Sequence, residues 1–257
     1  MDRLDKILAG TGRWSRREVK GLVRAGRVTV NGAVAGSPEQ KYDRLGLDLR
    51  VDGAPIGAEK FVYLMLHKPG GVLSATEDPK QSTVVDLLPE YLRRVGLFPV
   101  GRLDKDTEGL LLLTNDGPLG HRLLAPGRHV DKVYFVRVEG TLTAEDAAAF
   151  AAGMTLGDGL RCMPAGLERL PEPDTALVTL REGKYHQIKR MLACRGKPVR
   201  YLKRLSMGPP RLDEDLGPGE WRELTADPSA SSEGNWKDAD MKEWGRMVRD
   251  ELTTLKK

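Results

Sequence analysis

The chain has 257 residues, of which 40% are hydrophobic and 30% charged, and its formal net charge is +4. This length accommodates one large domain, or a small and a medium one, with a core that needs no disulfide or metal support. No apolar run approaches the length of a membrane span, and the charged start, MDRLDK, is unlike a secretory signal. We therefore expect a globular, cytoplasmic protein without a membrane segment.

The two cysteines, Cys162 and Cys194, lie far apart and have no neighbouring cysteine. This usage suits a reducing cytoplasm and argues against a disulfide framework or a zinc-finger site. The four histidines show no H-E-x-x-H spacing, and neither G-x-G-x-x-G nor G-x-x-x-x-G-K-[ST] is found. We therefore expect no metal and no cofactor.

Positive charge is concentrated in two stretches of the sequence. Residues 1–30 contain eight Lys and Arg against three Asp and Glu, and residues 181–211 contain ten against one. Residues 212–257 reverse the balance, with twelve acidic and seven basic residues. Two basic stretches indicate a polyanion that contacts the protein in two places, although a solvated surface would explain either stretch alone.

The first basic stretch has the pattern of two helices. Leu4, Ile7 and Leu8 have helical spacing, and Ser15 with Glu18 forms a capping-box pattern that opens a second helix. Basic residues recur along and just beyond this second helix, at Arg16, Arg17, Lys20, Arg24 and Arg27. Most of them are three or four positions apart, which predicts a basic stripe on the exposed face.

A hairpin and a linker are expected next. Asn31-Gly32, within residues 28–34, predicts a tight hairpin, and the Gly- and Pro-containing residues 53–57 are expected to be a linker. A helix, a basic helix and a hairpin with V-x-V-N-G resemble the RNA-binding domain named after ribosomal protein S-four. The resemblance implies that residues 1–57 hold RNA by phosphate contacts and shape. A structural helix pair with a solvated face is the alternative.

Beyond residue 57, predicted strands and helices interleave without a regular rhythm. Strands are expected over residues 61–66, 110–113, 133–138, 176–180 and 199–205, and helices over residues 84–88, 144–152 and 186–194. This irregular order predicts an α+β fold. Residues 229–257 are a charged C-terminal extension, whose residues 236–255 have the composition of a surface helix.

The most distinctive segment is GRLDKDTEGLLLLTNDG, residues 101–117. It places Arg102 and Asp104 ahead of a continuous apolar run that is typical of a strand buried on both faces. With Arg102 and Lys105 beside it, we expect the Asp104 carboxylate to be ionised and able to act as a nucleophile. An Arg-x-Asp pair in a loop is more often structural than catalytic, so this pattern alone leaves the role open.

The motif GRLD-x-D-x-x-GLL-x-x-T-x-D-G resembles the signature of RsuA-like pseudouridine synthases, which modify ribosomal RNA. The resemblance implies that Asp104 is the catalytic aspartate and that Arg102 acts in flipping the target base and holding the loop. Lys132-Val133-Tyr134 is similar to the K-x-Y element of the family, whose tyrosine stacks on uracil and takes part in proton transfer. The K-P-G-G turn at residues 68–71 is similar to the family's opening motif.

Residues 182–190, EGKYHQIKR, are similar to the last motif of the family. The resemblance implies that Lys189 pairs with the catalytic aspartate, that Ile188 forms the apolar wall of the uracil pocket, and that Arg190 binds substrate or shapes the loop. K-Y-H-Q within this segment looks most like the enzymes of small-subunit ribosomal RNA. The family resemblance implies a catalytic domain at residues 58–228, with a mainly antiparallel mixed sheet flanked by helices.

The leading hypothesis is a monomeric enzyme that isomerises a uridine in ribosomal RNA, either as free RNA or in an assembling subunit. Small-subunit RNA is favoured, and large-subunit RNA is the alternative substrate. A non-catalytic protein that binds ribosomal RNA or assists ribosome assembly is a second hypothesis. The third is a glycoside hydrolase that pairs Asp104 with Asp106 or Glu108; the basic surroundings disfavour it, because one of its carboxyls must stay protonated.

Overall fold

The computed structural model describes residues 1–58, 60–124 and 130–224. These residues form two compact units. The first contains residues 1–62, 75–98 and 114–116, and the second contains residues 63–74, 99–113 and those from 117 onward. The expected C-terminal extension, residues 229–257, lies outside the described residues. None of the helices described is long and apolar enough to cross a membrane.

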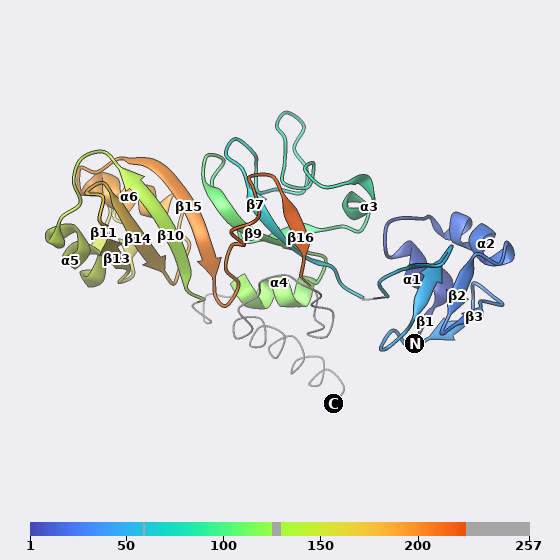
Figure 1. Cartoon of the computed structure of the whole chain (residues 1–257). Coiled ribbons are helices and arrows are strands. Elements are labelled where there is room, and N and C mark those ends of the chain that lie inside the picture. The colour runs from blue at the N-terminus through green and yellow to red at the C-terminus, as the bar shows by residue number, and fades with distance from the viewer. Residues whose placement is uncertain (59, 125–129, 225–257) are drawn as a thin grey trace. The chain divides into compact units, whose positions relative to one another are not determined.

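The N-terminal region combines two helices with short strands (Figure 1). The helices are α1 (Leu4–Ala9) and α2 (Arg16–Arg24). The strands are β1 (Asp2–Arg3), β2 (Val28–Val30), β3 (Ala33–Val34), β4 (Lys41–Tyr42), β5 (Leu49–Val51) and β6 (Ala54–Pro55). A four-stranded antiparallel sheet has the order β3-β2-β5-β6, and β1 pairs with β4.

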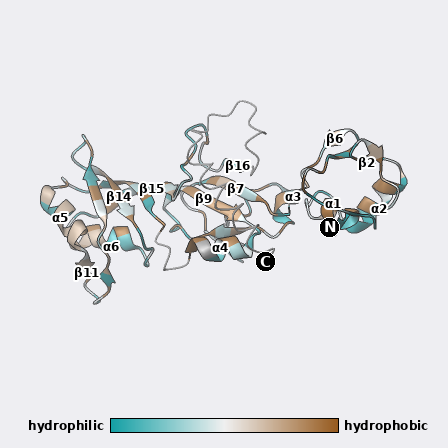
Figure 2. Cartoon of the chain, turned by 90° about the horizontal axis from the view of Figure 1, so that it is seen from below, coloured by the Kyte–Doolittle hydropathy of each residue, from teal (hydrophilic) through white to brown (hydrophobic). Residues whose placement is uncertain are grey.

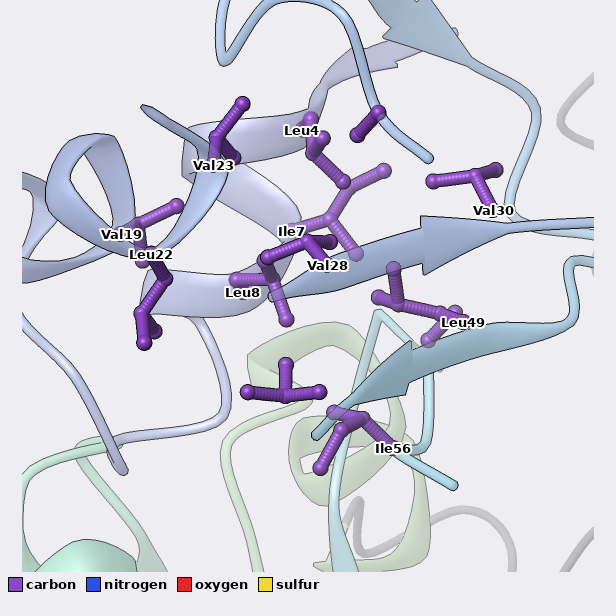
Figure 3. Close-up of a cluster of buried hydrophobic side chains, with 13 residues drawn as sticks. Leu4, Ile7, Leu8, Val19, Leu22, Val23, Val28, Val30, Leu49 and Ile56 are labelled. Carbon is purple, nitrogen blue, oxygen red and sulfur yellow. The ribbon is translucent and has the colours of Figure 1, made fainter. Parts of the chain in front are cut away.

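Local sequence signals in this region are confirmed. The Ser15 hydroxyl accepts the Glu18 N–H at 3.3 Å, and the Glu18 carboxylate accepts the Ser15 N–H at 2.6 Å, which completes the capping box. Asn31 and Gly32 have positive φ angles of 50° and 81°, as the tight β2–β3 turn requires. The apolar sides of helices and strands meet in one core (Figure 3), which includes Leu4, Ile7, Leu8, Val19, Leu22, Val23, Val28 and Leu49.

The expected linker at residues 53–57 is wrong. Asp52 and Gly53, with φ angles of 54° and 78°, turn the chain from β5 into β6. Ile56 is buried and belongs to the N-terminal core. Pro55 is tolerated because β6 is an edge strand, where one N–H is not needed for pairing. The Gly and Pro content therefore marks a hairpin rather than a linker.

The remaining elements centre on an eight-stranded mixed sheet of order β13-β14-β10-β15-β9-β7-β16, with β8 paired to β9. Its strands are β7 (Tyr63–Lys68), β8 (Phe98–Val100), β9 (Glu108–Thr114), β10 (Lys132–Val138), β13 (Gly166–Arg169), β14 (Thr175–Leu180), β15 (Val199–Met207) and β16 (Trp221–Glu223). Strands β15 and β9 run parallel, whereas β13–β14, β14–β10, β10–β15 and β7–β16 are antiparallel. The expected α+β class and mainly antiparallel sheet are confirmed.

Beyond residue 62, the described residues also form four helices and a separate strand pair (Figure 1). The helices are α3 (Glu90–Arg93), α4 (Gly117–Leu124), α5 (Ala144–Ala152) and α6 (Gln187–Cys194). The separate pair is β11 (Met154–Thr155) with β12 (Arg161–Cys162). The sequence predicted α5 and α6, whereas α4 was not expected, although a Pro near a helix start is a recognised signal.

The middle of the sheet is strongly apolar, as the brown sections of β7 and β9 show (Figure 2). Leu110 to Leu113 are each at most 4% exposed, which confirms a strand covered on both faces. Gly109 permits the parallel pairing with β15, because a Cβ there would lie 2.2 Å from the Arg204 carbonyl oxygen. Its φ of +102° also favours glycine.

The helix expected over residues 84–88 is wrong, because this segment forms turns. The Asp86 carboxylate accepts the N–H and the hydroxyl of Thr83 at 2.8 and 3.0 Å. These bonds resemble half of a capping box, but Pro89 follows Leu88 and disfavours helical backbone at the residue before it, so the turns do not continue as a helix. Val84 and Leu88 are buried nevertheless, so their spacing reflects a packed turn rather than a helix face.

Candidate active site

Asp104 lies on the loop between β8 and β9, and a buried lysine fixes this loop. The fully buried Lys68 donates its ammonium group to the carbonyl oxygens of Pro69, Lys105 and Thr107, at 2.9, 3.1 and 2.8 Å. Burial lowers the pKa of Lys68 from 10.5 to about 8, although three nearby carboxylates oppose the shift. Lys68 therefore ties the end of β7 to the part of the loop that follows Asp104.

A second buried side chain fixes the same loop. The Ser74 hydroxyl donates to the Leu103 carbonyl at 3.0 Å and accepts the Leu103 N–H at 3.1 Å. The Thr107 N–H donates to the Asp104 carbonyl at 3.1 Å and closes a turn. The residue before Asp104 and the residues after it are thus both held, which leaves the carboxylate in a fixed position.

The cation that contacts Asp104 comes from α6. The Lys189 ammonium lies 3.0 Å from one Asp104 oxygen and 2.5 Å from an Asp106 oxygen. Burial disfavours its charge, but the hydrogen bonds to Asp106 and Asp104 outweigh burial and raise the pKa of Lys189. His186 lies on the other side, with its Nε2 3.5 Å from the second Asp104 oxygen. The side chain of Asp104 is 27% exposed, so its contact with Lys189 is partly shielded from water.

Asp104 opens into a pocket of about 440 Å³ that includes open solvent. The predicted residues that line it come from separate parts of the chain: Arg102, Asp104, Tyr134, Ile188 and Lys189. Tyr134 on β10 is 8% exposed and Ile188 on α6 is 4% exposed, so both form apolar walls. The structure thus brings five of the six residues expected at the substrate site around one pocket.

The sixth residue, Arg190, is not among those that line the pocket. Its guanidinium group pairs with Asp158 at 2.5 Å. The structure therefore gives Arg190 a contact with a neighbouring loop, and its expected contact with substrate stays a prediction. Arg102, in contrast, is exposed at the pocket and forms no ion pair with any residue that the structure describes.

The residues expected to bind RNA on the N-terminal basic stripe are of two kinds. Arg16, Arg17 and Arg24 are exposed, and none pairs with an acid among residues 1–58 or the other described ranges. Lys20 pairs with an exposed glutamate at 3.3 Å, and Arg27 pairs with an exposed aspartate at 2.5 Å. Exposed pairs of this kind are weak, so they compete only weakly with phosphate.

Two further polar groups at the pocket were not expected. Gln187 is 3% exposed, accepts the Lys184 N–H at 3.0 Å and donates to Glu182 at 2.7 Å, which folds the segment before α6. Thr107 lines the pocket and is 2% exposed, and its hydroxyl oxygen has no hydrogen-bond partner among the residues described. No sequence signal marked these roles, because each depends on tertiary contacts.

The geometry does not suit a glycoside hydrolase that uses Asp104 with Asp106. Such an enzyme must keep one carboxyl protonated as a general acid. The hydrogen bond from Lys189 is the main cause that lowers the pKa of Asp106, and the same ammonium contacts Asp104. The other candidate, Glu108, accepts the Tyr201 hydroxyl at 2.8 Å. Within the described ranges, no group of three or more His, Cys, Asp and Glu could hold a metal ion.

Family models match both parts of the chain. Residues 62–194 match the model described as RNA pseudouridylate synthase, and residues 2–44 match the S4 domain. A crystal structure of a pseudouridylate synthase superimposes with a TM-score of 0.61 at 33% identity, covering 88% of this chain and 96% of that one.

Full-length relatives agree with these models. The uncharacterised RNA pseudouridine synthase YtzG of Bacillus subtilis is 48% identical over 87% of this chain and 95% of its own length. Ribosomal small subunit pseudouridine synthase A of Pseudomonas aeruginosa is 44% identical over 88% and 97%. Ribosomal large subunit pseudouridine synthase B of Vibrio cholerae is 40% identical over 87% and 71%. The chain therefore belongs to the RNA pseudouridylate synthase family, in its RsuA-like branch, and carries an S4 domain in its N-terminal part.

Proposed function

We propose that this chain isomerises one uridine of small-subunit ribosomal RNA to pseudouridine, with Asp104 as the nucleophile. The observation that carries the proposal is the half-buried Asp104–Lys189 pair, which lines one pocket with Tyr134 and Ile188. The reaction breaks the N1–C1′ bond, turns the detached uracil and joins C5 to the same sugar carbon; C5 then loses its proton, and N1 gains one. Nothing is oxidised and no water is consumed, so side chains suffice.

Each pocket residue has a proposed role in this reaction. A base within folded RNA must be extruded to reach Asp104, at a cost of a few kcal/mol. Stacking on Tyr134 offsets about 1–3 kcal/mol of that cost, and Ile188 closes the apolar wall. Arg102 is exposed at the pocket, and Lys68 and Ser74 already hold its loop, so we assign Arg102 to the RNA and to base flipping.

We assign the remaining RNA contacts to the N-terminal domain. Residues 1–57 act as the RNA-binding domain through Arg16, Arg17 and Arg24, helped by Lys20 and Arg27, and residues 58–228 form the catalytic domain. Exposed basic side chains grip phosphates without reading bases. The protein acts as a monomer in the cytoplasm, on ribosomal RNA or an assembling subunit.

Small-subunit RNA is proposed over large-subunit RNA for two reasons. Residues 184–187 resemble the small-subunit enzymes, and several relatives are named as small-subunit pseudouridine synthases. Pseudouridine synthase A of the small subunit in Pseudomonas aeruginosa and in Escherichia coli is 44% and 37% identical to this chain. Tyr185 is 75% exposed and stacks on His186 with ring centroids 3.8 Å apart. This stacked pair stands beside the pocket, where it can contact RNA around the target base.

An assay with purified components tests the proposal. The protein is incubated separately with small-subunit ribosomal RNA, immature small subunits and large-subunit ribosomal RNA, and pseudouridine is located by chemical labelling. We expect one modified uridine in the small-subunit samples. A product in large-subunit RNA alone would change the substrate, and tight binding without product in any sample would favour the non-catalytic alternative.

A further inference from the structure

A second cavity borders the catalytic pocket. It has an open volume of about 660 Å³, and its lining includes Asp106, Lys189, Pro198, Arg200, Tyr201 and Leu202. Lys189 and Leu202 also line the catalytic pocket. One ammonium group therefore contacts Asp104 in the first cavity and Asp106 in the second. A ligand in the second cavity would lie directly beside the target base.

Tyr201 gives this cavity a fixed aromatic wall. Its hydroxyl donates to Glu108 at 2.8 Å, and its ring makes an edge contact with Phe135, with centroids 6.1 Å apart. The two rings come from neighbouring strands β15 and β10 (Figure 1). Burial and the bond to Glu108 raise the pKa of Tyr201 to about 12, so the hydroxyl stays protonated and the ring stays anchored. An anchored, partly exposed ring suits stacking of a nucleic-acid base.

The charges of the cavity favour a neutral base over a phosphate. Lys189 is already shared by two carboxylates. The pair of Arg200 with Glu139 at 2.7 Å is exposed, so it competes only weakly with a backbone phosphate beside the base. Asp106 has a 77% exposed side chain, so its carboxylate faces solvent at the cavity and would repel a phosphate. The same carboxylate can accept a hydrogen bond from an amino or ring N–H group of a base.

We propose that this second cavity binds the base of the nucleotide next to the target uridine. The base stacks on Tyr201 and donates a hydrogen bond to Asp106, while the uridine occupies the pocket of Asp104. The inference rests on the proposed function, because it places the neighbouring nucleotide relative to the flipped uridine. It adds a contact that reads sequence context, which phosphate-binding arginines cannot do.

A double-mutant cycle tests this subsite. The RNA is the ribosomal segment that the wild-type protein modifies, prepared intact or with an abasic residue on the 5′ or 3′ side of the uridine. We expect an abasic residue on one side to raise the wild-type KM about tenfold, the size of one base stack. Tyr201→Ala should raise KM by the same factor on intact RNA, and the abasic residue should cause no further rise in this variant.

Tyr201→Phe is the matched control, because it keeps the ring and removes only the hydroxyl bond to Glu108. It should raise KM less than Tyr201→Ala does, because the stacking ring remains and only its anchor is lost. The proposal would be overturned if neither abasic RNA raised the wild-type KM. It would also be overturned if, for both the 5′ and the 3′ abasic RNA, the KM rise from Tyr201→Ala multiplied the rise from the abasic residue. So would a loss in Tyr201→Phe equal to that in Tyr201→Ala.

A fluorescence readout covers the case in which Tyr201→Ala does not fold. 2-Aminopurine replaces the neighbouring base, and its emission is followed as the wild-type protein binds. Stacking on Tyr201 predicts quenching at one side, and unchanged emission at both sides would contradict the subsite. Failure of the subsite and failure of the proposed function can be told apart. The double-mutant cycle is run only on RNA in which the wild-type protein makes pseudouridine, whereas a wild-type protein that makes none in any ribosomal RNA would refute the proposed function.

Discussion

The basic stripe of α2 and the basic start of α6 are both positively charged, but the groups around these charges differ. Arg16, Arg17 and Arg24 on α2 stand in solvent, without an acid partner among the described residues. Lys189 on α6 has a 22% exposed side chain and holds two carboxylates. Exposed cations attract a polyanion in a way that salt screens, whereas a shielded cation fixes the position and charge of one acid.

The difference teaches that a dense basic stretch in sequence can serve binding or chemistry. In residues 181–211, partly buried cations are paired with acids: Lys189 contacts two carboxylates, and Arg190, with a 27% exposed side chain, pairs with Asp158. Around α2 the pairs that do form, such as Lys20 with Glu39, are exposed at both partners. We therefore expect substitutions at α6 to change kcat and substitutions at α2 to change RNA affinity.

The largest expected effect is that of Asp104→Asn. An amide has nearly the same shape but is not a nucleophile, so we expect kcat to fall by at least about a thousandfold while RNA binding persists. Single-turnover pseudouridine formation and RNA Kd measure the two quantities. Asp106→Asn is the matched control, since Asp106 also contacts Lys189 but does not line the catalytic pocket; its kcat should fall less than about tenfold. Equal losses in the two variants would contradict the assignment.

The next largest effect is expected for Lys189→Met. Without the ammonium, Asp104 and Asp106 repel each other and lose their shared partner. We expect kcat to fall about a hundredfold, because the Asp104 carboxylate loses the cation that positions it. Lys189→Arg keeps the charge and should retain most activity. A kcat of Lys189→Met within about threefold of wild type would show that the cation does not act on Asp104.

Lys68→Met should have an intermediate effect. The change leaves three loop carbonyls without their donor, so the Asp104 loop is less well fixed. We expect kcat to fall about tenfold, with RNA Kd nearly unchanged. Lys132→Met is the control, because Lys132 is also partly buried but donates to the Val130 carbonyl, away from this loop. A larger loss in Lys132→Met would contradict the role of Lys68.

The pH dependence of stability tests the burial of Lys68 directly. Its folded pKa of about 8 lies below the ordinary value of 10.5. Between these values the unfolded chain keeps a proton that the folded chain has lost, so the free energy of unfolding rises with pH. Urea unfolding of wild type relative to Lys68→Met should therefore show a difference that grows from pH 8 to pH 10. A difference that stays flat would mean that Lys68 is not buried as a cation.

The smallest expected effects belong to α2. Replacing Arg16, Arg17 and Arg24 with Gln should weaken RNA binding and reduce the slope of log K against log salt by about 0.7–0.9 for each lost phosphate contact. The rate at saturating RNA should not change. Replacing Lys20 and Arg27 removes cations that already have acid partners and should reduce the slope less. An unchanged slope in the triple variant would exclude α2 from the RNA interface.

Local signals predicted the N-terminal helices, the β2–β3 hairpin and α6, because caps, turns and helical spacing are encoded by adjacent residues. Two predictions were wrong because the sequence pattern fits more than one local structure. The spacing of Val84 and Leu88 fits a helix, but Pro89 disfavours helical backbone at Leu88, and the segment forms buried turns. Residues 53–57 have the composition of a linker, yet Ile56 is buried in the N-terminal core.

The candidate site was predictable where a motif names a residue and not where tertiary contact assigns it. The motif and resemblance identified Asp104, Tyr134 and Lys189, and the structure brings them together. Adjacent sequence suggested Arg102 and Lys105 as the charges beside Asp104, whereas the contacting cation is Lys189. The anchoring by Lys68 depends on three carbonyls spread over two loops, which no local pattern reveals.

A map of pseudouridines in ribosomal RNA, from cells that lack this protein and are complemented with wild-type or Asp104→Asn protein, tests the central claim most directly. The account predicts that one small-subunit site is missing in the deletion, returns with the wild-type protein and stays absent with Asp104→Asn. A site that Asp104→Asn restores, or a deletion strain that lacks no site, would contradict it.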